Sequence, residues 1–306
     1  MGRACAFSGA AAKDSRESPL AKLLIGGSVT VLFEAFAGGH FLEFLKISKQ
    51  TSPNETYMQI TRRIMQHKGL AGTLDGFVPW GMAQCIAKGA VFSFGQAQAL
   101  VLLHDNKYIS PQASMVLSGG IGGFIQGVVM SPLLLLKTRV MTDPAFRAAG
   151  SAWETSVRSA KIGARVIRSE GMLALCKGML VFSNKRFADW TSRYFFVVLL
   201  EQQIKDHPND RLTGQQQVVC SLGGGSLSAL ATIPIDVLVA AKQDAAKAGQ
   251  KVSVIDLYRE KIRSGGLGGT FKFATAGLVA RVAHVALTTL MMKTVTSKVY
   301  DLVYRQ

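Results

Sequence analysis

Pro234-Ile235-Asp236-Val237-Leu238-Val239 ends a long apolar stretch of this chain, and variants of these six residues occur twice more. About one hundred residues upstream the chain reads Pro132-Leu133-Leu134-Leu135-Leu136-Lys137, and about ninety further upstream it reads Phe41-Leu42-Glu43-Phe44-Leu45-Lys46. Each of these three hexads follows an apolar run that contains glycine and precedes a polar stretch. A unit of about 100 residues that occurs three times predicts a repeat architecture.

The composition favours a protein that lies in a membrane. Its 306 residues are 48% hydrophobic and yet carry a formal charge of +16, a combination that is unusual for a soluble basic protein. Strong positive charge is also typical of nucleic-acid-binding domains. No such module is visible, however, and the basic residues are spread along the chain. Basic residues at membrane boundaries and an anion pathway explain the charge better, and no nucleic-acid partner is expected.

The cysteines and the N-terminus restrict the function further. Cys5, Cys85, Cys176 and Cys220 have no CxxC spacing and no histidine cluster nearby, which predicts reduced packing thiols and no metal site. Residues 1–17 lack an apolar core and mix acidic with basic residues. We therefore expect a disordered tail there rather than a signal or transit peptide. The sequence shows no nucleophile–base set, paired carboxylates or nucleotide loop, so no enzymatic activity and no cofactor is expected.

Six apolar runs are long enough to cross roughly 30 Å of hydrocarbon, which requires about 20 residues. Their polar content predicts that each run turns one face toward a protected interior. Within each pair of runs lies a shorter amphipathic stretch, which predicts a helix at the membrane surface. The six runs cover about residues 20–48, 77–103, 113–141, 179–204, 214–244 and 274–303, and the amphipathic stretches are Thr56–His67, Trp153–Ser169 and Ser253–Ser264. Glycines such as Gly123 and Gly127 recur along the third run and predict close helix packing.

The three hexads resemble the P-x-[D/E]-x-x-[K/R] signature of the mitochondrial carrier family. The resemblance implies an all-α membrane protein with six transmembrane helices in three pseudo-symmetric repeats, each with a short surface helix on the matrix side. It places the repeats at residues 18–110, 111–210 and 211–306, in a multi-pass protein of the mitochondrial inner membrane.

A second element follows each amphipathic stretch: Lys68-Gly69…Asp75-Gly76, Glu170-Gly171…Lys177-Gly178 and Gly265-Gly266…Lys272-Phe273. These resemble the family's [D/E]-G…[K/R]-G element, which implies bound cardiolipin at backbone N–H groups near Gly69, Gly76, Gly171 and Gly178. The pattern is intact in the second repeat, so lipid binding is best supported near Gly178.

The resemblance also implies that the acid of each hexad pairs with the base of the next repeat and closes the matrix side. The implied pairs are Glu43 with Lys137, Asp236 with Lys46, and Leu134 with Val239. The last pair has lost both charges together, which is energetically coherent because two apolar partners can replace a buried ion pair at little cost. Phe94-Gly95-Gln96-Ala97-Gln98 lacks the charges that close the other side in the family, so strictly coupled exchange is not predicted.

Basic residues inside the predicted spans indicate an anion site. Each of Lys88, Lys185, Arg186, Arg193 and Arg281 costs about 2.5–3.5 kcal/mol in a membrane unless it faces water or a partner, and Glu34 is the only acid deep in the first run. This excess suits a ligand with two or three carboxylates, gripped by arginines. Pro79-Trp80 with Gln84 and Lys88, and Asp189-Trp190 with Arg193, also resemble a fungal branch of the family that exchanges citrate and oxoglutarate. The predicted substrate-binding set is Glu34, Gln84, Lys88, Lys185, Arg186, Arg193 and Arg281.

Alternative interpretations remain open for several residues. Lys88 can pair permanently with Glu34, Arg193 can brace helix packing, and His284 fits a satisfied interior histidine better than a ligand. Trp80 and Trp190 fit packing aromatics better than substrate stackers. The leading hypothesis is an exchanger of di- and tricarboxylates. The alternatives are a structural subunit of a respiratory complex that no longer transports, and a carrier of another anion such as a nucleotide or a sulfur compound.

Overall fold

The computed structural model describes residues 19–51, 55–74, 77–104, 108–142, 151–171, 173–176, 179–205, 212–247 and 277–304, with isolated positions between 256 and 275. These residues form helices joined by short turns, and none of them lies in a strand. The predicted all-α class is confirmed. The predicted tail, residues 1–17, lies outside the described residues.

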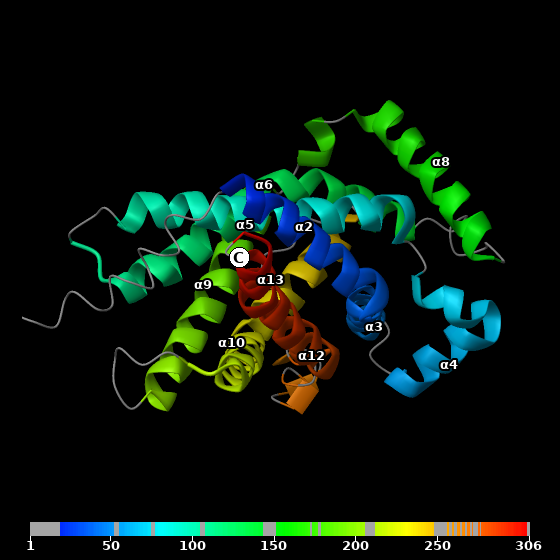
Figure 1. Ribbon diagram of the computed structural model, residues 1–306. Coiled ribbons are helices and arrows are strands. Elements are labelled where there is room, and N and C mark those ends of the chain that lie inside the picture. Colours follow the sequence, from blue (N-terminus) through cyan, green and yellow to red (C-terminus); the bar gives the residue numbers. More distant parts are fainter. Residues whose placement is uncertain are drawn as a thin grey trace, which may run out of the picture.

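All six apolar runs are helical, and they pack side by side into a closed bundle (Figure 1). In order around the bundle, α2 packs on α5, α5 on α6, α6 on α9, α9 on α10, and α10 on α12. The ring closes where Tyr300 of α13 packs against Ala21, Ile25 and Val29 of α2. The rods are α2 (Pro19–Phe36) with α3 (Gly39–Thr51), η2 (Phe77–Gly81) with α5 (Met82–His104), α6 (Pro111–Thr142), α9 (Met179–Ile204), α10 (Gly214–Lys247), and α12 (Leu278–Thr289) with η4 (Leu290–Val295) and α13 (Thr296–Tyr304).

The first rod is bent at a glycine that lies just before its hexad. Segments Leu23–Phe36 and Gly39–Lys46 meet at 65°, and Gly38 between them has a φ of 78°, a conformation that side chains disfavour. In the other two repeats a proline lies inside the helix, Pro132 in α6 and Pro234 in α10. The bend of the first rod therefore comes three residues before Phe41, the position that matches those prolines.

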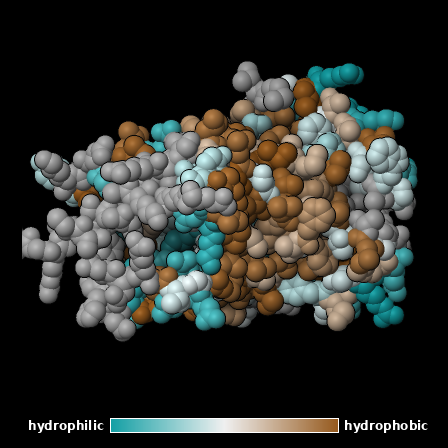
Figure 2. Space-filling view, viewed as in Figure 1, coloured by the Kyte–Doolittle hydropathy of each residue, from teal (hydrophilic) through white to brown (hydrophobic). Residues whose placement is uncertain are grey.

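Length and hydropathy identify four described helices that can cross a membrane, and five when the bent pair α2–α3 counts as one crossing. The four are Phe77–His104, Pro111–Lys137, Gly214–Val237 and Leu278–Tyr304. The remaining long rod, α9, carries several charges in its first half, including Lys185, Arg186 and Asp189, and is not among them. Figure 2 shows an apolar belt across the middle of one face, which fits a membrane-embedded bundle.

Two helices lie outside the bundle, at the same end of it (Figure 1). They are α4 (Tyr57–Lys68), which begins with a capping box at Thr56, and α8 (Ala152–Glu170), which is capped by Ser151. Both coincide with predicted surface helices. The third predicted surface helix, Ser253–Ser264, is described at too few positions to test. A short 3₁₀ turn follows each of the two, η1 (Gly69–Leu74) and η3 (Leu173–Cys176).

Trp80 anchors α8 to the bundle. Its indole Nε1 donates to the Ser159 carbonyl at 3.0 Å, and its ring covers Gly163, where an added Cβ would lie 2.4 Å from the indole. Ile162 and Val166 pack against the same ring. Trp80 is therefore a packing aromatic, one of the two roles that the sequence left open.

The glycines of α6 mark its contact with α9. An added Cβ at Gly127 would lie 2.5 Å from the Cα of Ser183, and one at Gly123 would lie 2.6 Å from the Arg186 carbonyl oxygen. The two backbones can approach this closely only because no side chain separates them. The glycine stripe thus allows α9, with its charged residues, to pack closely against α6.

Candidate functional site

The three hexads meet at one end of the bundle, which we call the hexad end. Lys137 Nζ lies 3.2 Å from Glu43 Oε2, and Lys46 Nζ lies 2.8 Å from Asp236 Oδ2. Both charged contacts that the sequence pattern predicts are therefore present. Leu134 is half-buried in α6, whereas the side chain of Val239 is not described, so the predicted apolar pair stays a prediction.

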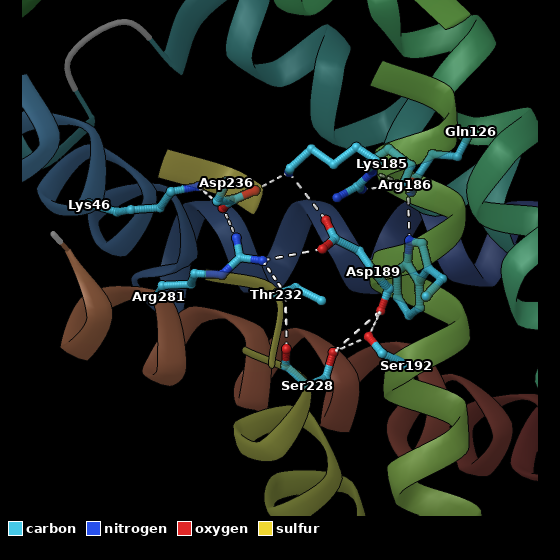
Figure 3. Close-up of polar contacts among 11 residues, drawn as sticks. Lys46, Gln126, Lys185, Arg186, Asp189, Ser192, Ser228, Thr232, Asp236 and Arg281 are labelled. Atoms are coloured by element: carbon cyan, nitrogen blue, oxygen red, sulfur yellow. Dashed lines mark hydrogen bonds and ion pairs between the residues drawn. The ribbon is translucent and has the colours of Figure 1, made fainter. Parts of the chain in front are cut away.

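Asp236 also belongs to a larger ring of charges, drawn in Figure 3. Its carboxylate pairs with Lys185 of α9 and with Arg281 of α12. Asp189 bridges the same two cations, with its carboxylate oxygens 3.2 Å from Lys185 Nζ and 3.2 Å from Arg281 Nη2. Arg281 Nη2 additionally donates to Thr232 Oγ1 at 2.6 Å. We call Lys185, Asp189, Asp236 and Arg281 the charged quartet.

The quartet is buried, with side-chain exposures between 2% and 12%. Ions in such a place are tolerated because they are paired, and removal of one partner typically costs about 3–5 kcal/mol. The quartet joins Asp236 of the hexad end to Lys185 of α9 and Arg281 of α12, two residues that the sequence assigned to substrate. Lys185 and Arg281, two predicted substrate-binding residues, are therefore joined through Asp236 to Lys46, one of the predicted closing residues.

Sequence reasoning missed Asp189 as a member of this network. Its spacing of four residues from Lys185 on one helix was a usable signal, since such pairs face each other on a helix surface. Its contact with Arg281, 92 residues away, had no local signal. The sequence argument that Glu34 alone would face five bases is therefore wrong, because Asp189 and Asp236 balance two of them.

Glu34 and Lys88 form a second buried pair between α2 and α5. Glu34 is 1% exposed and Lys88 is 8% exposed. His284 Nε2 lies 3.6 Å from the same Glu34 oxygen, and the His284 ring stacks on Phe33. This geometry favours the interpretation of Lys88 as a paired residue and of His284 as an interior histidine.

Two other arginines of α9 contact no carboxylate among the described residues. Arg186 donates from Nε, at 2.9 Å, and from Nη2 to the amide oxygen of Gln126, which also accepts from Trp190 Nε1 at 3.1 Å. Arg193 is 4% exposed, lies over the Trp190 ring at 4.4 Å, and has Nε and Nη1 buried without a hydrogen-bond partner. A guanidinium with two unsatisfied buried donors is costly, and an anion relieves that cost.

Gln126 holds these parts together, because its amide nitrogen donates to the backbone carbonyl of Lys88 at 2.7 Å. It was not predicted from the sequence. Gln84, which was predicted, is buried at 6% exposure and its Oε1 has no hydrogen-bond partner in the described part of the chain. It is an acceptor that can receive a donor from a ligand.

The described interior charges do not balance. The basic side chains in these contacts are Lys46, Lys88, Lys137, Lys185, Arg186, Arg193 and Arg281, and the acidic ones are Glu34, Glu43, Asp189 and Asp236. With His284 neutral, the described network carries three more positive than negative charges. Such an excess is what a bound polyvalent anion would neutralise.

Toward the opposite end of the bundle, the charged network borders an apolar cluster. Phe92 of α5, Trp190 and Tyr194 of α9, and Met292 of η4 form one buried cluster, with Phe92 stacked on Trp190 at 3.7 Å between ring centroids. Beyond it, Lys293 Nζ lies 2.5 Å from Glu201 Oε1. The sequence identified no charged motif at this end in register, and it did not predict this pair. Trp190 is therefore a buried packing aromatic, which is one of the two roles that the sequence left open.

The turns after the surface helices share one conformation. Gly69 after α4 has a φ of 59° and Gly171 after α8 has a φ of 76°, and Gly266 in the third copy has a φ of 59°. Glycine is the residue that adopts such angles readily. Gly76 and Gly178, the other two predicted lipid-binding glycines, lie outside the described residues.

A closed helical bundle with an apolar belt and a buried cationic network fits a membrane protein of the solute-transporter class. The mitochondrial carrier protein family matches residues 110–198. The chain is 25% identical over 266 residues to the citrate/oxoglutarate carrier protein of Saccharomyces cerevisiae, covering 83% of this chain and 82% of that protein. It is 27% identical over 135 residues to mitochondrial succinate-fumarate transporter 1 of Arabidopsis thaliana, covering 44% and 41%. A probable calcium-binding mitochondrial carrier of Caenorhabditis elegans is 25% identical over 244 residues, covering 78% of this chain and 32% of that protein.

These matches, together with the helical bundle, support a divergent member of the mitochondrial carrier family. Members of this family are transporters rather than enzymes, and the matches therefore support a transport protein of a mitochondrial membrane.

Proposed function

We propose that the protein exchanges di- and tricarboxylates, of the citrate and oxoglutarate kind, across the mitochondrial inner membrane by alternating access. The observation that carries this proposal is the uncompensated pair of arginines on α9. Among the described residues, Arg193 has two buried donors without a hydrogen-bond partner, and Arg186 donates its hydrogen bonds to the neutral amide of Gln126. Arginines bind carboxylates through two parallel hydrogen bonds. The relatives from Saccharomyces cerevisiae and Arabidopsis thaliana are named as carriers of citrate and oxoglutarate and of succinate and fumarate, all of which are carboxylates. These names support the same proposal.

The substrate enters a network whose cations already hold carboxylates. A substrate carboxylate competes with Asp236 for Lys185 and Arg281, and Asp236 also holds Lys46 at the hexad end. Binding therefore weakens one of the contacts that close that end. Gln84 accepts a hydrogen bond from a substrate hydroxyl, and Lys88 contributes positive charge while it remains paired with Glu34.

The same proposal completes the membrane topology. The 26 residues of α9 extend about 39 Å at 1.5 Å per residue, which is enough for a sixth crossing whose charges face the interior. The three repeats then span 18–110, 111–210 and 211–306, with α4 and α8 on the matrix side. Cardiolipin is the proposed partner of the turns at Gly69 and Gly171, where backbone N–H groups follow the surface helices.

The test is exchange by the purified protein in liposomes, with Arg186→Gln as the site variant and Arg165→Gln as its matched control. Arg165 is exposed on α8, so its loss should leave exchange of citrate and oxoglutarate intact, whereas Arg186→Gln should abolish most of it. Saturating substrate at 100 times its dissociation constant should stabilise the wild type by about 2.7 kcal/mol, and the Arg186→Gln variant far less. A wild type that shows no exchange and no ligand stabilisation, yet co-purifies with a respiratory complex, would refute transport and support a structural subunit.

A further inference from the structure

We infer that Asp189 is a specificity-determining residue that sets how many negative charges the transported anion carries. This inference rests on the proposed carboxylate transport and names a residue that the family resemblance did not assign. Asp189 is 3% exposed and bridges two of the cations proposed to meet the substrate, Lys185 and Arg281.

The position of Asp189 on α9 places it among the proposed substrate contacts. Lys185, Arg186 and Arg193 lie four residues before, three before and four after it, which puts all four on one side of the helix. Figure 3 shows the Asp189 carboxylate pointing toward Lys185 and Arg281, between α9 and α12. A bound anion that reaches either cation must come close to the Asp189 charge.

The bridging geometry shows what Asp189 does there. One oxygen accepts from Lys185 at 3.2 Å and the other pairs with Arg281 at 3.2 Å, so the side chain occupies an anion position that a further ligand carboxylate would otherwise take. Its negative charge lowers the positive excess of the described network to three. Without it the excess would be four, and the network would favour anions of higher charge.

The expected size of the effect follows from Coulomb's law. At about 6 Å and an effective dielectric constant of about 20, one charge on the protein changes the binding of one ligand charge by a factor on the order of 10 to 100. A role confined to stabilising the fold would lower transport of all anions together. A charge-setting role changes the ratio between anions, which is the quantity to measure.

The experiment compares propane-1,2,3-tricarboxylate with glutarate, since the two differ only by the central carboxylate. Their relative exchange rates and their stabilisation of the purified protein are measured for the wild type, Asp189→Asn and Thr232→Asp. We expect Asp189→Asn to raise the preference for the tricarboxylate at least tenfold. Thr232→Asp places a new carboxylate beside Arg281, which Thr232 already contacts, and should shift the preference the opposite way.

Two controls define the outcome. Glu201→Gln removes the same charge from a pair outside the quartet and should leave the preference within twofold of the wild type. Asp189→Glu keeps the charge and should keep the preference. A wild type that exchanges carboxylates, with the same preference in every folded variant, would overturn this inference and leave the proposed transport standing. A wild type that transports neither anion, nor any other carboxylate, would instead overturn the transport itself. If Asp189→Asn does not fold, the Thr232→Asp shift decides the question.

Discussion

Glu34→Gln removes the carboxylate that holds Lys88 inside the bundle. Both side chains are at least nine-tenths buried, so the change leaves an ammonium with no opposing charge in direct contact. Breaking a buried pair on one side typically costs about 3–5 kcal/mol. At roughly 2–4 °C per kcal/mol, the melting temperature should fall by about 6–20 °C.

The double variant Glu34→Gln/Lys88→Gln distinguishes lost pairing from general damage. Because it removes both charges, it should recover most of the stability, with a coupling of about 2–3 kcal/mol in the thermal-stability cycle. The same cycle on Glu55 and Arg63 is the matched control. That pair, 2.8 Å apart with side chains 35% and 52% exposed, should couple by no more than about 1 kcal/mol.

Ligand-induced stabilisation of the Glu34→Gln variant tests whether Lys88 also binds the substrate. In Glu34→Gln, a carboxylate supplies the charge that Lys88 has lost, so citrate or oxoglutarate should stabilise this variant more than the wild type. Equal ligand stabilisation of both would mean that Lys88 is a purely structural residue. Additive effects of the two single changes, with coupling below about 0.5 kcal/mol, would refute the pairing argument itself.

If Leu134 and Val239 form the apolar pair inferred for the hexads, either Leu134→Asp or Val239→Arg alone should destabilise the protein. The double variant should recover about 0.5–3 kcal/mol of stability. Additive effects of the two single changes in a thermal-stability cycle would show that the two side chains do not meet. Gly127→Ala forces a Cβ to within 2.5 Å of the Ser183 Cα and should lower stability by about 1–3 kcal/mol. Alanine at Gly268, where an added Cβ has no neighbour within 4 Å, is its control, and equal melting temperatures for the two alanine variants would contradict the close packing of α6 on α9.

The sequence was most informative where one motif recurs. Three hexads about a hundred residues apart define which acid faces which base, and Glu43–Lys137 and Lys46–Asp236 are in contact as that pattern predicts. The sequence also located the rods and the surface helices α4 and α8, because apolar periodicity and capping residues are local properties of the chain.

Contacts without a repeat were beyond the sequence. Glu201 and Lys293 meet across 92 residues, and neither occupies a motif position that would identify the other. Gln126 is an ordinary polar residue in an apolar run until α9 places Arg186 and Trp190 against its amide oxygen. Such contacts depend on how the rods rotate against each other, which the glycine stripe permits but does not fix by itself.

The hexad end and the apolar cluster are held together by different interactions, and this difference bears on the proposed exchange. At the hexad end, Lys46 and Glu43 each keep about a fifth of their side chain exposed, so water and a substrate carboxylate can compete for these contacts. The buried cluster of Phe92, Trp190, Tyr194 and Met292 offers an anion no ion pair to compete for, and its separation would expose apolar surface at a cost of about 25 cal/mol per Å². An anion seated at Arg193, against the face of Trp190, lies directly beside that cluster. The proposed anion would therefore compete both for the ion pairs at the hexad end and for the contact of Arg193 with Trp190.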